Sequence, residues 1–377
     1  MSGAVRIPLL DLGLQHAEVA AEIGRGFERV LASQRFVGGP EVEDFERRYA
    51  EHIGVAHCVG VGNGTDALEL ALRAVEVGSG HEVIVPANSF VATALAVLRA
   101  GGTPVVVDCD PVTHALDLGE VARRLGPRTR AAIPVHLFGQ QTPVEDLVTL
   151  LAGTRARVVE DAAQVHGARR HGRSVAALGA AAATSFHPSK NLGAYGDAGA
   201  ILTNDPEIAR RVRALRNYGG EERYVHPEVG FNSRLDALQA VVLRAKLACL
   251  ARWNAARAAA AARYDALLAD DPRVRRPAAL AGNEHVWHLY VVRVPARDRV
   301  LAHLTEAGIE AAVHYPTPLH LTGALASLGH RPGDFPVAER LAGEILSLPV
   351  FPGITAEQQE RVVRELRAAL DHEDVGR

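Results

Sequence analysis

The chain has 377 residues, 48% of them hydrophobic and 23% charged, which is ordinary for a globular protein with a large core and is long enough for two domains. Its 41 basic and 44 acidic residues nearly balance without long runs of either sign, so the sequence carries no electrostatic footprint for nucleic acid or a membrane surface. Charges or glycines interrupt the apolar runs, the N-terminal apolar segment is too short for a signal peptide, and the three cysteines lack metal-binding spacing. We therefore expect a cytoplasmic protein with no membrane span and no metal site.

Short apolar strands alternate with helical patterns from about residue 40 to residue 205. We expect strands at 55–62, 82–86, 103–108, 130–139, 156–161, 183–186 and 199–204, and helices at 63–78 and 89–101. Continuous apolar strands between helices predict a mostly parallel sheet that helices cover on both faces. The fold class is therefore α/β.

Ligands of such sheets bind at the carboxyl ends of the strands. Asn63, Asn88, Asp161 and His187 all fall at or just after an expected strand end. This edge of the sheet is the expected place for a site.

The pattern changes after about residue 235, where a helical stretch runs without a breaker until Pro272. This stretch is expected to link two parts of the protein. Beyond it we expect strands and helices in alternation, the strands at 285–294 and 310–315 and the helices at 297–308 and 337–348. The sequence thus predicts a large domain over residues 1–245 and a small α+β domain over residues 246–377.

The segment NGTDAL (63–68) follows a strand and opens a helix. Free N–H groups and the positive end of the helix dipole suit a phosphate there, since Gly64 permits close approach and Thr65 adds a hydroxyl. The alternative is a plain helix cap. In EDAAQ (160–164), Asp161 ends a strand and either caps the next helix or, if buried, holds a cation.

The segment SFHPSKNLGAYGDAGA (185–200) places a single lysine in an irregular, glycine-rich stretch after a strand. A desolvated lysine loses its proton more easily and becomes a nucleophilic amine, which is one interpretation of Lys190. The alternative is an ordinary surface lysine in a loop. For His187, the alternative to a functional role is a structural hydrogen bond.

Three later segments contain further polar candidates. In GFNSRLD (230–236), Arg234 either pairs with Asp236 or binds a substrate anion. HYPTPLH (314–320) is a turn rich in proline with His314, Tyr315 and His320, whose spacing is not that of a metal pair. VWHL (286–289) adds His288. Packing of aromatic side chains is the alternative for both of these segments.

Taken in order, these segments resemble the sugar aminotransferases that use pyridoxal 5'-phosphate, the DegT/DnrJ/EryC1/StrS family. The resemblance rests on the ordered set NGTDAL, VPANSFVAT, VHLFGQ, EDAAQVHGA, SFHPSKNLGAYGDAGA, NYGG, GFNSRLDALQA, HYPTPLH and LSLPVF, and it runs from about Pro8 to near the C-terminus. It implies fold type I of the enzymes that use this cofactor, with a mostly parallel seven-stranded sheet between helices and a smaller C-terminal domain.

The resemblance also implies roles at the cofactor. Lys190 matches the lysine that binds the cofactor covalently, and Asp161 matches the carboxylate beside the pyridinium nitrogen. Gln164 matches the side chain beside the ring hydroxyl, and Phe90 matches the aromatic residue stacked on the ring; its alternative is an ordinary core phenylalanine.

Phosphate contacts follow from the same resemblance. Gly64, Thr65 and Ser185 match the phosphate-binding positions. Asn232 matches a residue that reaches the phosphate from the neighbouring subunit, which implies a homodimer with shared active sites. The chain departs from many relatives at His81, where an acid is common, and at His187 and Ser189 in SFHPSKN, where SFYPGKN is common. The last two changes bear on substrate contacts.

The implied reaction moves an amino group from L-glutamate to a nucleotide-linked keto-sugar, with Lys190 as base and acid. Within the family, the resemblance is greatest to enzymes that aminate C3 of a dTDP-linked 3-keto-6-deoxyhexose, on the combination of NSRLD with WHL and HYPTPLH. The rivals are an aminotransferase acting at C4 or on a cyclitol, a dehydratase that uses pyridoxamine phosphate, and a regulator that binds the cofactor without turnover. Relatives of the dehydratase kind lack the lysine that this chain has at 190.

Overall fold

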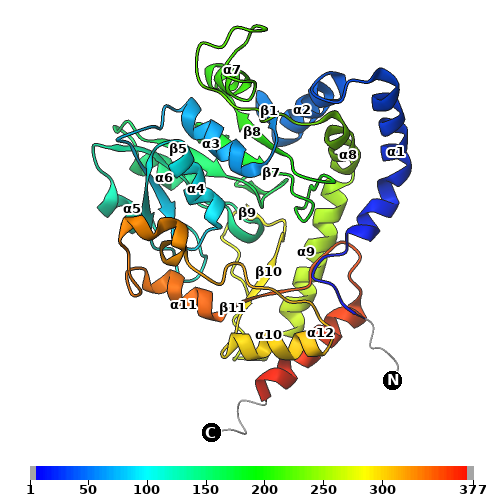
Figure 1. Cartoon of the computed structure of the whole chain (residues 1–377). Coiled ribbons are helices and arrows are strands. Elements are labelled where there is room, and N and C mark those ends of the chain that lie inside the picture. The colour runs from blue at the N-terminus through cyan, green and yellow to red at the C-terminus, as the bar shows by residue number, and fades with distance from the viewer. Residues whose placement is uncertain (1–5, 372–377) are drawn as a thin grey trace.

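The structure, a computed structural model, describes residues 6–371. Its central sheet has seven strands in the order β1-β8-β7-β5-β4-β2-β3 (Figure 1). Their bounds are β1 His57–Val61, β2 Glu82–Pro86, β3 Thr103–Val107, β4 Thr129–Ala132, β5 Arg157–Asp161, β7 Ala181–Ser185 and β8 Gly199–Thr203. Only β8 runs antiparallel to its neighbours, β1 and β7. The predicted mostly parallel sheet is confirmed.

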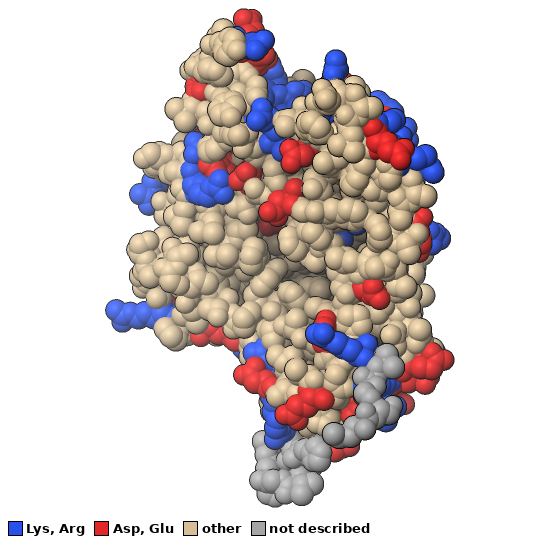
Figure 2. All heavy atoms as spheres, turned by 45° about the vertical axis from the view of Figure 1, so that its right-hand side comes forward, with Lys and Arg blue, Asp and Glu red and all other residues tan. Residues whose placement is uncertain are grey.

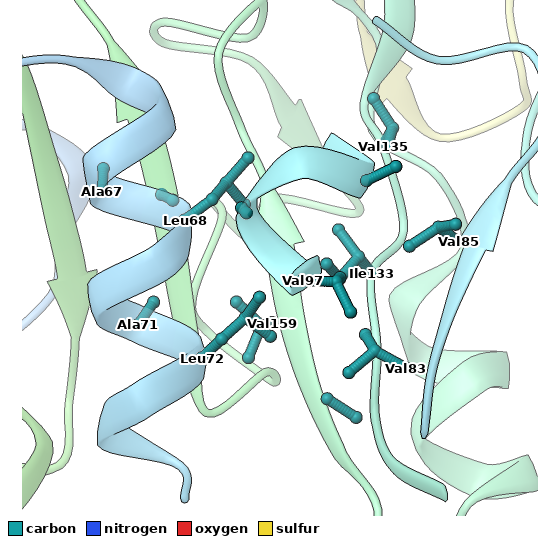
Figure 3. Packing of buried hydrophobic residues seen from close by; sticks show 14 of the residues in the cluster. Ala67, Leu68, Ala71, Leu72, Val83, Val85, Val97, Ile133, Val135 and Val159 are labelled. Carbon is teal, nitrogen blue, oxygen red and sulfur yellow. The ribbon is translucent and has the colours of Figure 1, made fainter. Parts of the chain in front are cut away.

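Helices cover both faces of the sheet because successive strand residues point to opposite sides. On one face pack α3 (Gly64–Ala74), α4 (Val91–Arg99) and α7 (Pro206–Leu215). Figure 3 shows Leu72 of α3 beside Val159 of β5, and Val97 of α4 between α3 and the β2 residues Val83 and Val85. The other face carries α2 (Pro40–Ile53) and α8 (Ala237–Leu247) near β1, β7 and β8, and α5 (Leu118–Arg124) with α6 (Val144–Leu150) near β3, β4 and β5.

The expected long helix after residue 235 is two helices, α8 and α9 (Leu250–Leu267). The helix is interrupted at Ala248 and Cys249, and the sequence has no glycine or proline there that would predict a helix end. The helix α1 (Leu12–Ser33) packs beside α8, and α9 continues toward the C-terminal helices (Figure 1).

The C-terminal part is built on β10 (Tyr290–Arg293), paired antiparallel with β11 (Ile345–Leu348), and on α10 (Arg297–Glu306) and α12 (Ala356–Asp371). Two expectations were wrong here. The segment 310–315 forms only an isolated bridge, between Ala312 and Ser347. The helix expected over 337–348 is α11 (Pro336–Glu344), and its last four expected residues are strand β11, whose partner β10 is distant in sequence.

A separate hydrophobic cluster holds this part together and includes Ile7 from the N-terminal segment beside Tyr264, Tyr290 and Leu366. The first described residues therefore pack with the C-terminal part. Two short strands, β6 (Arg169–Arg170) and β9 (Asn283–Glu284), form another small sheet. None of the helices in residues 6–371 is both long and apolar enough to cross a membrane.

Candidate active site

A pocket of about 590 Å³ opens at the carboxyl ends of the sheet strands. It brings together ten of the residues predicted from the sequence: Gly64, Thr65, Phe90, Asp161, Gln164, Ser185, His187, Lys190, His314 and Tyr315. These residues come from the start of α3, the loop before α4, the ends of β5 and β7, the loop after β7 and the C-terminal part.

Lys190 lies in the loop between β7 and β8, at the floor of the pocket. Its backbone N–H donates to the carbonyl of His187 at 2.9 Å, and the N–H of Ala194 donates to the carbonyl of Phe186 at 2.8 Å, so the loop folds back on itself. Burial lowers the pKa of the Lys190 ammonium to about 8, and the nearby Asp161 carboxylate opposes this shift. About a tenth of the amine is therefore neutral, and nucleophilic, at pH 7, far more than for a lysine with its ordinary pKa.

Asp161 ends β5 and is only 7% exposed. Its Oδ2 accepts a hydrogen bond from Thr93 Oγ1 at 2.8 Å, and its Oδ1 accepts one from the Ala163 N–H at 3.2 Å. Burial raises the pKa of this carboxyl group, and the two hydrogen bonds oppose that rise. A cation placed against Asp161 would stabilise the carboxylate, since a buried charge needs a partner.

Gln164, Tyr315 and Phe90 form the adjoining wall. Gln164 Oε1 accepts the N–H of Phe138 at 2.6 Å, and its Nε2 donates to the Tyr315 hydroxyl at 3.2 Å. The Phe90 and Tyr315 ring centres lie 5.2 Å apart, yet Phe90 remains 51% exposed. A half-exposed phenylalanine ring in a pocket offers an apolar surface for a planar ligand.

The start of α3 faces the same pocket. Asn63 caps the helix by accepting the N–H of Asp66 at 2.8 Å. The N–H groups of Gly64 and Thr65 belong to the first turn, which has no preceding turn to bond. A Cβ added at Gly64 would lie 2.6 Å from the Cβ of Ser185, so glycine lets α3 approach the end of β7. Backbone donors and two hydroxyls thus gather where an anion fits.

His187 and Ser189 lie at the pocket rim and interact with each other. Ser189 Oγ lies 2.9 Å from His187 Nδ1, and the His187 ring is exposed. His314 pairs through Nδ1 with Ser347 Oγ at 2.8 Å, and burial lowers the pKa of its imidazole to about 4. His314 is therefore neutral where it lines the pocket.

Three predicted residues lie outside the pocket of their own chain. Asn232 is exposed, and the Arg234 guanidinium lies 5.7 Å from the centre of the Tyr218 ring. His320 is buried and pairs with Glu339 at 2.9 Å, so the structure does not bring it to the site.

One group at the site was missed, and a second was named without a role. Thr93 supports Asp161 and is itself 2.7 Å from Ser89 Oγ; no local pattern signalled this role, because Asp161 lies 68 residues further along the chain. His288, a candidate in VWHL with aromatic packing as its alternative, also lines the pocket. Within residues 6–371, no group of three or more His, Cys, Asp or Glu side chains could hold a metal ion.

Comparison with known proteins decides the family. The model of the DegT/DnrJ/EryC1/StrS aminotransferase family matches residues 18–367. The chain belongs to this family. It is therefore a sugar aminotransferase that depends on pyridoxal phosphate, and its fold is type I.

Similar proteins cover almost the whole chain. The erythromycin biosynthesis sensory transduction protein EryC1 of Saccharopolyspora erythraea is 48% identical, over 96% of this chain and 99% of its own. A dTDP-3-amino-3,4,6-trideoxy-alpha-D-glucose transaminase of Streptomyces venezuelae is 44% identical, over 98% and 97%. The crystal structure of S. venezuelae DesV in complex with a ketimine intermediate has a TM-score of 0.94 and 44% identity, over 96% of this chain and 98% of that one.

The residues of the pocket fit pyridoxal phosphate. One cavity is lined by an amine with a lowered pKa, a buried carboxylate, a half-exposed aromatic ring and the start of a helix with two hydroxyl groups nearby. When bound, this cofactor supplies an electron sink that acidifies the α-carbon of an attached amine.

Proposed function

We propose that this aminotransferase moves an amino group from L-glutamate to a nucleotide-linked keto-sugar. The observation that carries the proposal is the Lys190 amine, with its pKa lowered to about 8, in one pocket with the buried Asp161 carboxylate. Because the chain belongs to an aminotransferase family that depends on this cofactor, we interpret the pair as a transamination site.

Each pocket residue then has a task. Lys190 would hold the cofactor between turnovers, and its free amine would take the proton from the α-carbon of the amino donor. Asp161 keeps the ring nitrogen protonated, with Thr93 orienting the carboxylate. Gln164 would lie beside the ring hydroxyl of the bound cofactor, and Phe90 would lie against its ring face.

The phosphate is assigned to the start of α3. Gly64 and Thr65 offer backbone and hydroxyl donors, and Ser185 adds a second hydroxyl. The helix dipole favours the phosphate charge at this end.

The sugar is assigned as a dTDP-linked 3-keto-6-deoxyhexose that is aminated at C3. Relatives at 44% identity in Streptomyces venezuelae and Micromonospora megalomicea are named dTDP-3-amino-3,4,6-trideoxy-alpha-D-glucose transaminases, which supports this choice. His187, His314 and Tyr315 border the pocket and are proposed to contact the sugar. Arg234 is also proposed to contact the substrate, from a second subunit, whereas His320 is buried against Glu339 outside the pocket.

We further propose a homodimer with shared sites. Asn232 is exposed and outside its own pocket, as a residue serving the partner's site would be. Residues 1–245 and 246–377 remain the proposed large and small domains, with the N-terminal segment around Ile7 packed on the small one.

A regulator without turnover is the second candidate, because two relatives carry regulatory names: EryC1 and, at 44% identity, the pleiotropic regulatory protein of Geobacillus stearothermophilus. Incubation with glutamate and a panel of nucleotide keto-sugars, with products read by NMR, separates the two. An amino sugar with its nitrogen at C3 supports the proposal. No turnover with any of them, in protein that holds the cofactor, favours the regulator.

The covalent assignment has its own test. The sequence contains two lysines, Lys190 and Lys246, so borohydride reduction followed by peptide mapping has only two lysine outcomes. We expect the cofactor to be fixed on Lys190. An adduct on Lys246 would overturn the assignment.

A further inference from the structure

Asn191, directly after Lys190, is 2% exposed, and its amide group is fully used. Its Nδ2 donates to Asn254 Oδ1 at 2.9 Å and to the carbonyl of Val286 at 2.9 Å. Asn254 itself donates through Nδ2 to the carbonyl of His166, so its Oδ1 is an acceptor. Two acceptors therefore fix the orientation of the Asn191 amide, and both of its hydrogens are committed.

The remaining polar atom of Asn191 fixes the tautomer of His288. Asn191 Oδ1 lies 3.1 Å from His288 Nδ1, and an amide oxygen can only accept. Nδ1 must therefore carry the hydrogen. Burial and the positive charges of Lys190 and Arg257 keep the pKa of His288 well below its usual value. The ring is neutral, which leaves an unprotonated lone pair on Nε2.

His288 forms part of the pocket wall, while Asn191 lies behind it. Among the described residues, Nδ1 has its partner in Asn191 and no hydrogen bond occupies Nε2. The guanidinium of the buried Arg257 donates to the carbonyls of His288 and Val350, at 3.4 and 2.8 Å, which fixes the backbone that carries the ring. The acceptor is thus preorganised before any ligand arrives.

We propose that His288, locked by Asn191, presents Nε2 to the pocket as an uncharged hydrogen-bond acceptor for a hydroxyl group of the sugar substrate. This inference rests on the proposed function. A lone pair suits a hydroxyl donor and repels the carboxylates of glutamate, so His288 acts in the sugar half-reaction alone. It is a specificity-determining residue rather than a support for Lys190.

Two substitutions separate these roles. His288→Asn keeps an amide donor at the place of Nδ1 but has no atom at the place of Nε2. In His288→Gln the amide oxygen can occupy the place of Nε2, but no donor remains at the place of Nδ1, which faces Asn191. If the acceptor matters, His288→Asn lowers kcat/KM for the keto-sugar about tenfold, the loss expected for one hydrogen bond, and His288→Gln retains more of it. The rate with glutamate stays near that of the parent protein in both.

The half-reactions are measured separately by following cofactor absorbance in single turnovers. An equal loss with glutamate and sugar in His288→Asn would show that the histidine acts through Lys190, and undiminished sugar turnover would show that Nε2 has no ligand. Either result overturns the proposal. Parent protein that reacts with glutamate but aminates none of the keto-sugars refutes the proposed substrate instead.

A second measurement does not depend on turnover. Nitrogen-15 NMR of histidine-labelled holoenzyme distinguishes the two neutral tautomers and the imidazolium, and the His288→Asn spectrum identifies the His288 signals. We expect the form with hydrogen on Nδ1 at pH 6. Hydrogen on Nε2, or a charged ring, would overturn the inference even if every variant were active.

Discussion

Thr93 is the residue on which the chemistry of Asp161 depends. It is fully buried, and its hydroxyl links the Asp161 carboxylate at 2.8 Å to Ser89 at 2.7 Å. Burial raises the pKa of Asp161, and the hydrogen bond from Thr93 is the largest contribution that opposes it. The hydroxyl therefore favours the ionised carboxylate.

We expect Thr93→Val to lower kcat about tenfold, because the shape is kept while one hydrogen bond to the carboxylate is lost. Thr93→Ser keeps the hydroxyl and is expected to restore most of the rate. Steady-state kinetics of both variants at equal cofactor occupancy checks this. Equal rates in Thr93→Val and the parent protein would remove Thr93 from its role.

The pKa of Lys190 depends on Asp161 in a direction that can be tested. Burial lowers both lysine pKa values to about 8, but only Lys190 has Asp161 opposing the shift. Removing that negative charge with Asp161→Asn removes a group that favours the ammonium, so the pKa of Lys190 falls further. NMR titration of lysine-labelled, cofactor-free protein shows just two side-chain signals. Lys246 is the internal control, and a shift of both signals, or of neither, would contradict the assignment.

At the scale of elements, the phosphate site depends on how closely α3 meets the strands. Gly64 packs on Ser185, and a Cβ at Gly199 would lie 2.5 Å from the backbone of Asn63. Both glycines lie at the junction of α3 with β7 and β8. Side chains there would push the helix start away from the strand ends.

We expect Gly64→Ala to weaken cofactor binding at least tenfold, because the added methyl group displaces either Ser185 or the first turn of α3. Equilibrium titration with the cofactor measures the effect. Gly78→Ala is the matched control, since a Cβ there meets nothing within 4 Å. Equal losses in the two variants would indicate general destabilisation rather than damage to the phosphate site.

Elements set by local pattern were predictable, and those set by distant partners were not. Apolar runs located all seven strands of the main sheet to within a few residues, except that β4 is shorter than expected. The segment Ile345–Leu348 looked like the end of a helix because its residues continue the apolar pattern, but it pairs with β10, more than fifty residues earlier. The break between α8 and α9 has no glycine or proline to announce it.

The residues of the site divide in the same way, into those that local sequence predicts and those that only the fold brings together. The motifs around Gly64, Asp161 and Lys190 were found from strand ends and family resemblance, and the pocket brings them together. Thr93 was not selected and His288 was named without a role, because their roles depend on Asp161 and Asn191, which only the fold places beside them.

At the scale of the whole molecule, association can be considered first from the distribution of charge. Figure 2 shows one face on which Lys and Arg lie beside Asp and Glu instead of gathering by sign. Apolar side chains are more informative: Tyr224 is 79% exposed and Val229 is 85% exposed, in the segment that leads to Asn232. This segment is where we expect a second subunit to pack.

Shared sites predict complementation. A mixture of Lys190→Ala and Asn232→Ala subunits forms heterodimers in which one site has both defects and the other has none. Equal, random mixing after subunit exchange should therefore recover about a quarter of the parent activity, as expected for two-fold symmetry. Each variant alone serves as its control. No recovery, once mass spectrometry shows heterodimers, would place Asn232 outside the partner's site.

The hydrogen bonds around Asn191 also bear on the exchange of segments between relatives. The residue lies before the proposed boundary at 245, whereas its partners Asn254, Val286 and His288 all lie after it. A chimera joined near residue 245 would combine the loop that carries Lys190 and Asn191 from one parent with residues 254, 286 and 288 from the other. Recombination of substrate specificities in this family should therefore carry residue 191 together with 254 and 288 as one inherited unit.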